Sequence, residues 1–225
     1  MDTGTTIRGR RSRLRDAAIA LLLALGMAPG LSAQTAAART IVFFGDSLTA
    51  GYGLTDPDAQ SYPAQVQRKI EAAHLPWRVV NAGLSGETSA GGLRRVDWVL
   101  NQKADIFVLE LGANDGLRGT SPSVTEANLQ AIIDRVRSRY PEARIVLAGM
   151  RMPPNMGPDY AEDFQAIYPA LAKRNGITLI PFLLAGVAMM PELNQGDGIH
   201  PTASGARIVA DGVWKAIQPL LMAVR

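Results

Sequence analysis

Short, continuous apolar runs alternate with longer amphipathic stretches along the chain from about residue 40 onwards. The apolar runs are unbroken, which is typical of strands buried on both faces of a parallel sheet. The runs that predict strands are residues 40–45, 78–82, 105–111, 144–150 and 177–182. The stretches that predict helices are residues 63–73, 93–102, 125–140, 160–175 and 203–221. Alternation of strand and helix with right-handed crossovers predicts a three-layer α/β sandwich without a second domain.

Polar and glycine-rich clusters follow the predicted strands. In an open parallel sheet, ligands bind beyond the carboxyl ends of the strands. The clusters are residues 45–48, 81–89, 112–116 and 151–155, and a further one, residues 197–201, precedes the last predicted helix. Because these ends meet at one edge of the sheet, the clusters predict a single site there.

The first 33 residues have the order of a secretory signal peptide. Residues 8–15 are rich in arginine, residues 17–28 are apolar, and small residues follow. The apolar run is shorter than the roughly 20 residues that span a membrane. We expect cleavage after Ala33 or Ala38, with an uncleaved N-terminal anchor as the alternative. A periplasmic or secreted domain at residues 40–225, with no stable membrane insertion after cleavage, follows from this interpretation.

Composition excludes several kinds of partner and site. The formal net charge is +3, but five arginines and two aspartates lie in residues 1–33. Removing them from the totals of 23 basic and 20 acidic residues leaves 18 of each, so the rest of the chain is formally neutral. No basic cluster with interleaved aromatics is present there, which argues against a nucleic-acid partner. The chain has no cysteine, which excludes disulfides, a zinc–thiolate site and a cysteine nucleophile.

A hydroxyl nucleophile needs a general base within hydrogen-bond reach, and that base needs an orienting group. The chain has two histidines. His74 lies at the end of a predicted helix, where the helix dipole or solvent accounts for it. His200 lies three residues after Asp197, and a tight turn through Gly198 lets both side chains project to one side. Spacing alone favours a catalytic pair and a cap of the last helix equally.

Three further residues favour the catalytic interpretation. Ser47 sits where the first predicted strand turns, which exposes its hydroxyl and its backbone N–H, although an N-cap serine is the alternative. Gly86 lets backbone approach a ligand closely, and Asn114 offers an amide donor. Together with the Ser47 N–H they form a candidate oxyanion site, the element that usually contributes most to acyl transfer.

Four ordered sequence blocks carry a family resemblance. They are GDSL with Ser47, the block GLSGETS with Gly86, GAND with Asn114, and DGIHP with Asp197 and His200. From about residue 40 the chain resembles the SGNH (GDSL) hydrolase superfamily. It is most similar to the bacterial branch known for arylesterase, acyl thioesterase and lysophospholipase activities.

The resemblance implies roles for these residues. Ser47 is then the nucleophile, His200 the base and Asp197 its orienting carboxylate. The oxyanion hole is then formed by the N–H groups of Ser47 and Gly86 and the Asn114 side chain; Gly83 is the alternative glycine, and the family pattern favours Gly86. The resemblance also implies a flavodoxin-like sheet of about five strands and no cofactor.

Other chemistries fit the sequence less well. It lacks the G-x-S-x-G elbow of an ordinary α/β-hydrolase, and it has no Gly-Lys dipeptide for a Walker A loop. Asp46, Asp115 and Asp197 have the ligand chemistry for Mg²⁺. We expect instead that Asp46 and Asp115 hydrogen-bond the loops that carry Ser47 and Asn114, and that the protein holds no metal.

Apolar side chains near the predicted site suggest the substrate. Leu117, Met150, Met152, Pro153 and Met156 predict a shallow acyl groove, because methionine adapts to varied apolar ligands; ordinary core packing is the alternative. Gly116 and Gly119 bracket Leu117 and Arg118, which predicts a mobile loop, and Arg118 is placed to meet a phosphate or carboxylate of a substrate.

We therefore expect a monomeric serine esterase acting on small-molecule esters and thioesters with small to medium acyl chains. Two alternatives remain open. One is a secreted carbohydrate O-deacetylase of the same superfamily, although aromatic residues are only 6% of the chain and few lie in the site loops. The other is a non-catalytic flavodoxin-like binding module, against which the intact Ser47, Asp197 and His200 argue.

Overall fold

The computed structural model describes residues 1–4 and 38–223. The chain divides into residues 1–36 and residues 37–225, and the fold described below is that of the second unit. Apart from its first four residues, the predicted signal peptide lies outside the described part of the chain. Within that part, no helix combines the length and the apolar character needed to cross a membrane.

A five-stranded parallel sheet forms the middle layer, with the strand order β2-β1-β3-β4-β5. The strands are β1 Arg39–Gly45, β2 Trp77–Gly83, β3 Ile106–Glu110, β4 Arg144–Ala148 and β5 Thr178–Ile180. From β1 the chain first adds a strand on one side and then crosses to the other. The ends of β1 and β3 therefore form a topological switch point, where open α/β sheets bind ligands.

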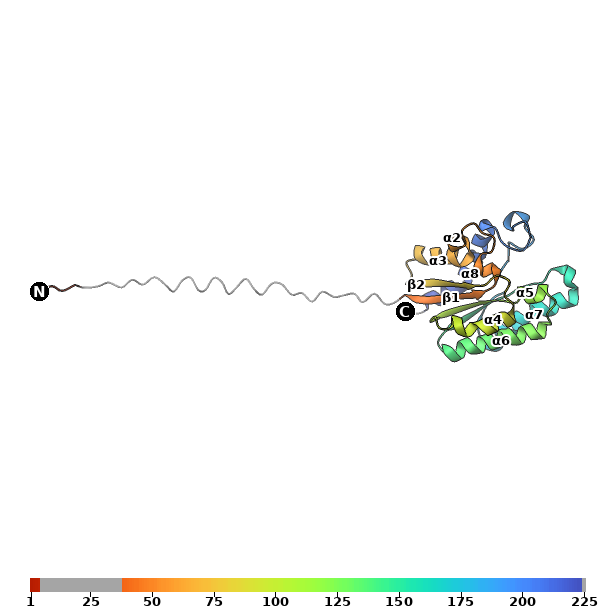
Figure 1. Ribbon diagram of the computed structural model, residues 1–225, viewed down its shortest axis with the longest axis horizontal. Coiled ribbons are helices and arrows are strands. Elements are labelled where there is room, and N and C mark those ends of the chain that lie inside the picture. The colour runs from red at the N-terminus through yellow and green to blue at the C-terminus, as the bar shows by residue number, and fades with distance from the viewer. Residues whose placement is uncertain (5–37, 224–225) are drawn as a thin grey trace. The chain divides into compact units, whose positions relative to one another are not determined.

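Helices cover both faces of the sheet (Figure 1). On one face α3 packs against α8, and on the other α4 packs against α6 and α6 against α7. These helices are α3 Tyr62–Ala72, α4 Ser89–Val99, α6 Pro122–Arg139, α7 Pro158–Asn175 and α8 Ala203–Met222. The predicted three-layer α/β sandwich with about five parallel strands is confirmed.

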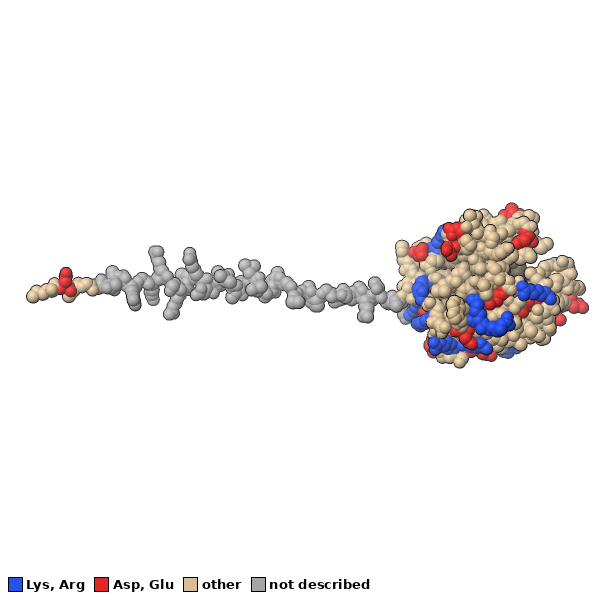
Figure 2. Space-filling model, in the orientation of Figure 1, with Lys and Arg blue, Asp and Glu red and all other residues tan. Residues whose placement is uncertain are grey.

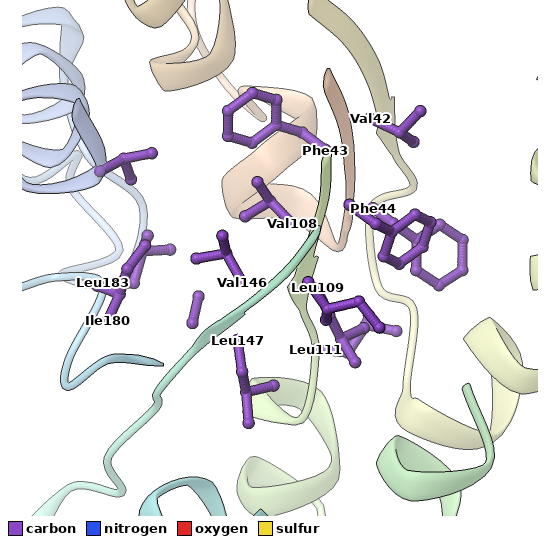
Figure 3. Close-up of a cluster of buried hydrophobic side chains, with 14 of the residues drawn as sticks. Val42, Phe43, Phe44, Val108, Leu109, Leu111, Val146, Leu147, Ile180 and Leu183 are labelled. Carbon is purple, nitrogen blue, oxygen red and sulfur yellow. The ribbon is translucent and has the colours of Figure 1, made fainter. Parts of the chain in front are cut away.

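The core consists of strand side chains that point alternately to the two helical layers. Phe43 and Val108 lie on one side of the strands, and Phe44 and Leu109 lie on the other (Figure 3). All four are fully buried. Continuous apolar strands are needed because both faces of this sheet are covered.

Short helices and helix starts differ from the prediction. The structure adds α1 Ser47–Ala50, α2 Pro57–Gln60 and α5 Ala113–Leu117, together with the 3-10 turns Pro154–Met156 and Pro191–Leu193. The predicted start of α6 at residue 125 is wrong, because Pro122 occupies the first turn, where its missing N–H costs nothing. Helix α4 begins four residues before its predicted start, where the Thr88 side chain accepts from the Gly91 N–H.

Candidate active site

The carboxyl ends of three neighbouring strands bring the predicted site residues together. Ser47 is the first residue of α1, directly after β1. Gly86 lies in the loop after β2, and Asn114 lies in α5, directly after β3. Asp197 and His200 come from the loop before α8.

The turn after β1 is built by its neighbours in the sequence. Asp46 caps α1, with its Oδ1 accepting from the Leu48 N–H at 2.9 Å. A Cβ at Gly45 would lie 2.2 Å from Thr49 Oγ1 and 2.4 Å from Glu110 Oε2. Only glycine therefore lets β1 pass this close to β3. Ser47 is thereby placed at the rim, outside the packed interior.

Ser47, His200 and Asp197 form a continuous line of hydrogen bonds. Ser47 Oγ lies 2.8 Å from His200 Nε2, and His200 Nδ1 lies 2.6 Å from Asp197 Oδ2. The other oxygen of Asp197 accepts from the backbone N–H groups of Ile199 and His200, at 2.9 and 3.0 Å. The Tyr52 ring packs on the imidazole with ring centroids 4.8 Å apart. The imidazole is thus held between a carboxylate and a hydroxyl.

The environment of Asp197 favours its charged form. Its side chain is 38% exposed. Partial burial acts to raise its pKa, but hydrogen bonds from the backbone and side chain of His200 and from Ile199 N–H outweigh it, together with the nearby imidazole. The pKa falls to about 2. Asp197 is therefore an anion at any working pH, suited to accept from an imidazole N–H.

Three residues with candidate donors, Ser47, Gly86 and Asn114, line one hollow in front of Ser47. Among residues 38–223, the N–H groups of Ser47 and Gly86 donate to no other protein group. Gly86 has φ +79°, a left-handed conformation that favours glycine. Asn114 Nδ2 donates both to Asp46 Oδ2 and to the carbonyl oxygen of Glu87, each at 3.1 Å. The Asn114 amide is therefore fixed from two sides.

Helix α5, which carries Asn114, is anchored by buried polar contacts. Asp115 is 1% exposed and accepts from the Ser89 N–H at 2.7 Å and from its hydroxyl at 2.6 Å. This carboxylate joins α5 to the first turn of α4. As predicted, Asp46 hydrogen-bonds the turn that carries Ser47, and it also accepts from Asn114. The Asp115 carboxylate instead bonds Ser89 of α4, not the segment that carries Asn114. No group of three or more His, Asp or Glu residues suited to a metal occurs in the described part of the chain.

A pair of buried carboxyl groups lies behind the Ser47 turn. Glu110 is fully buried, and its Oε2 accepts from the Asp46 N–H at 3.1 Å and the Thr49 hydroxyl at 2.7 Å. Burial, reinforced by the Asp46 charge, raises the pKa of Glu110 well above its usual value. Burial also raises the pKa of Asp46 to about 6, although hydrogen bonds and the nearby His200 oppose the rise. Burial therefore favours the neutral form of Glu110.

An open hollow of about 320 Å³ lies in front of Ser47. Its apolar walls include Leu48, Ala113, Leu117 and Ile199, and its polar groups include those of the line of hydrogen bonds. Leu117 and Ile199 are 42% and 45% exposed. The hollow therefore presents apolar surface to an incoming ligand beside the Ser47 hydroxyl and the candidate donors.

The predicted methionine groove is only partly present. Met150 and Met152 are buried in the core, 3% and 9% exposed, so they do not form an open groove. Met156 is partly buried against the core and Pro153 is exposed, and neither is among the described residues that line the hollow. Of the five predicted substrate contacts, the structure places only Leu117 there. Residue type alone did not separate a rim methionine from a core methionine.

The predicted mobile loop at residues 116–119 is wrong in its first part. Gly116 lies within α5 and is buried. A Cβ at Gly116 would lie 2.0 Å from Met152 Sδ, so the Met152 side chain packs directly against this turn of α5. His74 is exposed at the end of α3 and does not line the hollow, which fits its assignment to the helix end.

Sequence reasoning did not single out Glu110, Tyr52 or Ile199. Glu110 had a visible signal, since it is the one charged residue within a predicted apolar strand, residues 105–111, apart from the first position. Tyr52 and Ile199 carried none, because exposed apolar residues are common on protein surfaces.

The fold and this arrangement define a class, and comparison with known proteins agrees with it. The sequence profile of the GDSL-like Lipase/Acylhydrolase family matches residues 43–208, and the chain belongs to this family. The predictions of an SGNH (GDSL) hydrolase and of an enzyme of the esterase type are confirmed.

Particular relatives are similar over most of their length. Esterase TesA of Pseudomonas aeruginosa is 40% identical over 203 residues, covering 90% of this chain and 99% of that protein. Thioesterase 1/protease 1/lysophospholipase L1 of Escherichia coli (strain K12) is 41% identical over 192 residues, covering 85% and 89%. The crystal structure of TesA superposes with a TM-score of 0.76 at 38% identity, covering 81% of this chain and 99% of that one.

Proposed function

We propose that the protein hydrolyses carboxylic esters and thioesters of small to medium acyl chains, with Ser47 as nucleophile. The observation that carries the proposal is the line from Asp197 Oδ2 through His200 to Ser47 Oγ, with distances of 2.6 and 2.8 Å. A hydroxyl, an imidazole and a carboxylate in this order are what acyl transfer requires.

The chemistry proceeds in two halves. Ser47 Oγ attacks the acyl carbon while His200 Nε2 takes its proton, and Asp197 stabilises the imidazolium through Nδ1–H. The tetrahedral intermediate collapses, and His200 returns the proton to the departing alcohol or thiol. Water then attacks the acyl-enzyme with His200 again as base, which releases the acid and restores Ser47.

The developing oxyanion is bound by the N–H groups of Ser47 and Gly86 and by the Asn114 amide. The absence of described protein acceptors for the two backbone donors supports this role. Fixed donors aimed at developing charge need no reorganisation during the reaction, which makes this contribution large.

The acyl chain is proposed to lie against Leu117 and Ile199 in the open hollow. Each buried CH₂ contributes up to about 0.8 kcal/mol, and a partly wet hollow returns less. We expect kcat/KM to rise severalfold from acetyl to about hexanoyl or octanoyl p-nitrophenyl esters and then to flatten. An enzyme restricted to acetyl groups on a polysaccharide, and inactive on octanoyl esters, would favour the deacetylase alternative.

Covalent labelling separates an enzyme from a binding module. A fluorophosphonate probe should modify wild-type protein at Ser47, as read by mass spectrometry of the peptide. The Ser47→Ala variant should stay unlabelled, with an unchanged circular dichroism spectrum as the control. A wild-type protein that is neither labelled nor active on any ester would contradict the proposal.

Export and a monomeric state remain part of the proposal. The arginine-rich and apolar order of residues 8–28 supports a signal peptide. N-terminal sequencing of the protein recovered from the periplasm or medium should begin at Gln34 or Arg39. Light scattering of that species should give the mass of one chain.

A further inference from the structure

A second hollow adjoins the one in front of Ser47. It measures about 470 Å³ and shares the lining residues Ser85 and Gly86 with the first, so the two hollows meet at the Gly86 loop. Its described lining is Leu84, Ser85, Gly86, Glu87, Thr88, Gly91, Arg94, Arg95 and Arg118. The non-acyl part of a ligand whose ester lay at Ser47 would have this second hollow beside it.

The second hollow carries an excess of positive charge. Three arginines line it against one acid, Glu87. Glu87 is already neutralised, because its carboxylate pairs with Arg95, which also donates to the Ala82 carbonyl oxygen at 2.9 Å. Basic side chains are visible over α4 and beside α5 on this face of the protein (Figure 2). The charges of Arg94 and Arg118 remain uncompensated within the hollow.

Arg94 and Arg118 are both available to a ligand. Both are exposed, and among residues 38–223 Arg94 has neither an ion-pair partner nor a hydrogen-bond acceptor. Arg118 donates one bond, from Nη2 to the Gly86 carbonyl oxygen at 3.2 Å, which leaves most of its N–H groups unused. That bond holds the guanidinium at the boundary between the two hollows. Arg118 also follows Leu117, a wall of the first hollow.

We propose that Arg94 and Arg118 form a subsite for a phosphate group on the non-acyl part of the substrate. This inference rests on the proposed esterase function and adds a preference for anionic acyl donors. The planar guanidinium matches phosphate oxygens with paired N–H donors, and two such groups around one hollow hold the anion on two sides. Two sources carry this chemistry, an acyl glycerophosphate and an acyl thioester of a phosphorylated thiol.

Matched substrate pairs isolate the phosphate. The first pair is 1-octanoylglycerol 3-phosphate and 1-octanoylglycerol, which differ only in the phosphate. The second pair is octanoyl-CoA and the neutral S-octanoyl-N-acetylcysteamine, which share the thioester. For each pair, the ratio of kcat/KM on the anionic substrate to kcat/KM on the neutral one is measured in wild type, Arg94→Gln, Arg118→Gln and the double variant.

We expect each single variant to lower the ratio about fivefold and the double variant about twentyfold, since partly exposed charge-assisted contacts are of moderate strength. Arg94→Gln is the cleaner test, because Arg118 also bonds the Gly86 loop. The matched control is Arg68→Gln, which removes an exposed arginine on α3, across the sheet, and should leave both ratios unchanged. Added NaCl should lower the wild-type ratios and leave those of the double variant nearly constant.

The outcomes separate this inference from the proposed function. A fall in the glycerophosphate pair alone assigns the subsite to glycerophosphate esters, and a fall in the CoA pair alone assigns it to the thioester. Ratios that do not change in Arg94→Gln and the double variant, while wild type cleaves the neutral substrates, overturn the subsite only. Failure of wild type to cleave any of the four substrates counts instead against the esterase function.

Discussion

Two aspartates flank Ser47, and their surroundings are opposite. Asp197, on the open side, has a side chain that is 38% exposed and a pKa lowered to about 2. Asp46, on the buried side, is 1% exposed and has a pKa raised to about 6, with desolvation as the main cause. The same functional group thus stays charged down to about pH 2 on one side and takes up a proton near pH 6 on the other.

The difference shows a division of roles across one short turn. On the open side, solvent and backbone donors keep Asp197 charged, which suits a partner for an imidazole that gains a proton. On the buried side, Asp46 and Glu110 hold the backbone of the turn and the Asn114 amide through hydrogen bonds. We therefore expect substitutions on the open side to change turnover and substitutions on the buried side to change stability.

The largest effect is expected on the open side, at Ser47. Ser47→Ala should lower kcat/KM on p-nitrophenyl butyrate by at least about 10³-fold, because the nucleophile is removed. Its urea unfolding midpoint should match that of wild type within error, since the side chain lies at the rim. A loss of activity of tenfold or less would remove Ser47 from the role of nucleophile.

Asp197→Asn should come next, with a loss of about 10²–10³-fold in kcat/KM. The amide cannot stabilise a protonated imidazole, and it presents a donor where Nδ1–H needs an acceptor. Because Asp197 is well exposed, the free energy of unfolding at pH 7 should change by less than about 1 kcal/mol. An Asp197→Asn variant that loses stability but keeps its activity would contradict the assignment of catalysis to the open side and stability to the buried side.

Asn114→Ala should lower kcat by about 10²–10³-fold with a much smaller change in KM, because an oxyanion donor acts in the transition state. Steady-state kinetics on one ester, with substrate varied well past KM, separates the two parameters. A variant altered only in KM would assign Asn114 to substrate binding instead.

On the buried side, two substitutions of Glu110 are compared. Glu110→Gln resembles a protonated carboxyl and retains an acceptor for the Asp46 N–H and the Thr49 hydroxyl, so stability should change by less than about 1 kcal/mol. Glu110→Leu leaves both donors buried without an acceptor and should cost about 2–4 kcal/mol. Urea unfolding at pH 7 measures both. Equal stability of the two variants would show that the carboxyl group does not hold the turn.

The smallest effect concerns pH. The folded-state pKa of Glu110 lies above its unfolded value, so its contribution to stability is present at low pH and lost as pH rises above the usual glutamate range. Glu110→Gln removes this loss, so its free energy of unfolding should rise relative to that of wild type from pH 4 to pH 7. Asp197 acts in the opposite direction, since its lowered pKa makes its small contribution vanish as pH falls toward 2. Urea unfolding of wild type and Glu110→Gln at pH 4 and at pH 7 measures this change. The same difference in stability at both pH values would refute the prediction.

Much of the fold was predictable because its signals are local and long. Five unbroken apolar runs and five amphipathic stretches predicted the strands and the major helices. Helices α1 and α5 were not predicted, since four or five residues are too few to show a helical period. The sequence did not predict the start of α4, because Gly91 and Gly92 in its first turn weaken the helical pattern. Gly92 is needed there because a side chain would clash with Leu111 and Phe44.

The candidate site was predictable where sequence blocks carry it and not where packing decides it. Ser47, Asn114 and His200 belong to short motifs at strand and helix ends. The burial of Met152 depends on its packing against Gly116 of α5, which no local pattern records. Glu110 meets the Ser47 turn because the sheet register sets Gly45 beside it, a pairing across 65 residues of chain. Such partners are fixed by tertiary structure alone.

The two hydrogen bonds of the Asn114 amide have a consequence for the resting enzyme. Both N–H groups of Nδ2 are occupied, one by Asp46 Oδ2 and one by the carbonyl oxygen of Glu87. Under the proposed mechanism, an arriving substrate must compete with the neutral Glu87 carbonyl oxygen for a hydrogen bond from Asn114. A ground-state ester oxygen gains little by the exchange, whereas an oxyanion gains a charge-assisted bond. Under that mechanism, the Glu87 carbonyl occupies an N–H of Asn114 until negative charge develops, so the amide would favour the transition state over the bound ester.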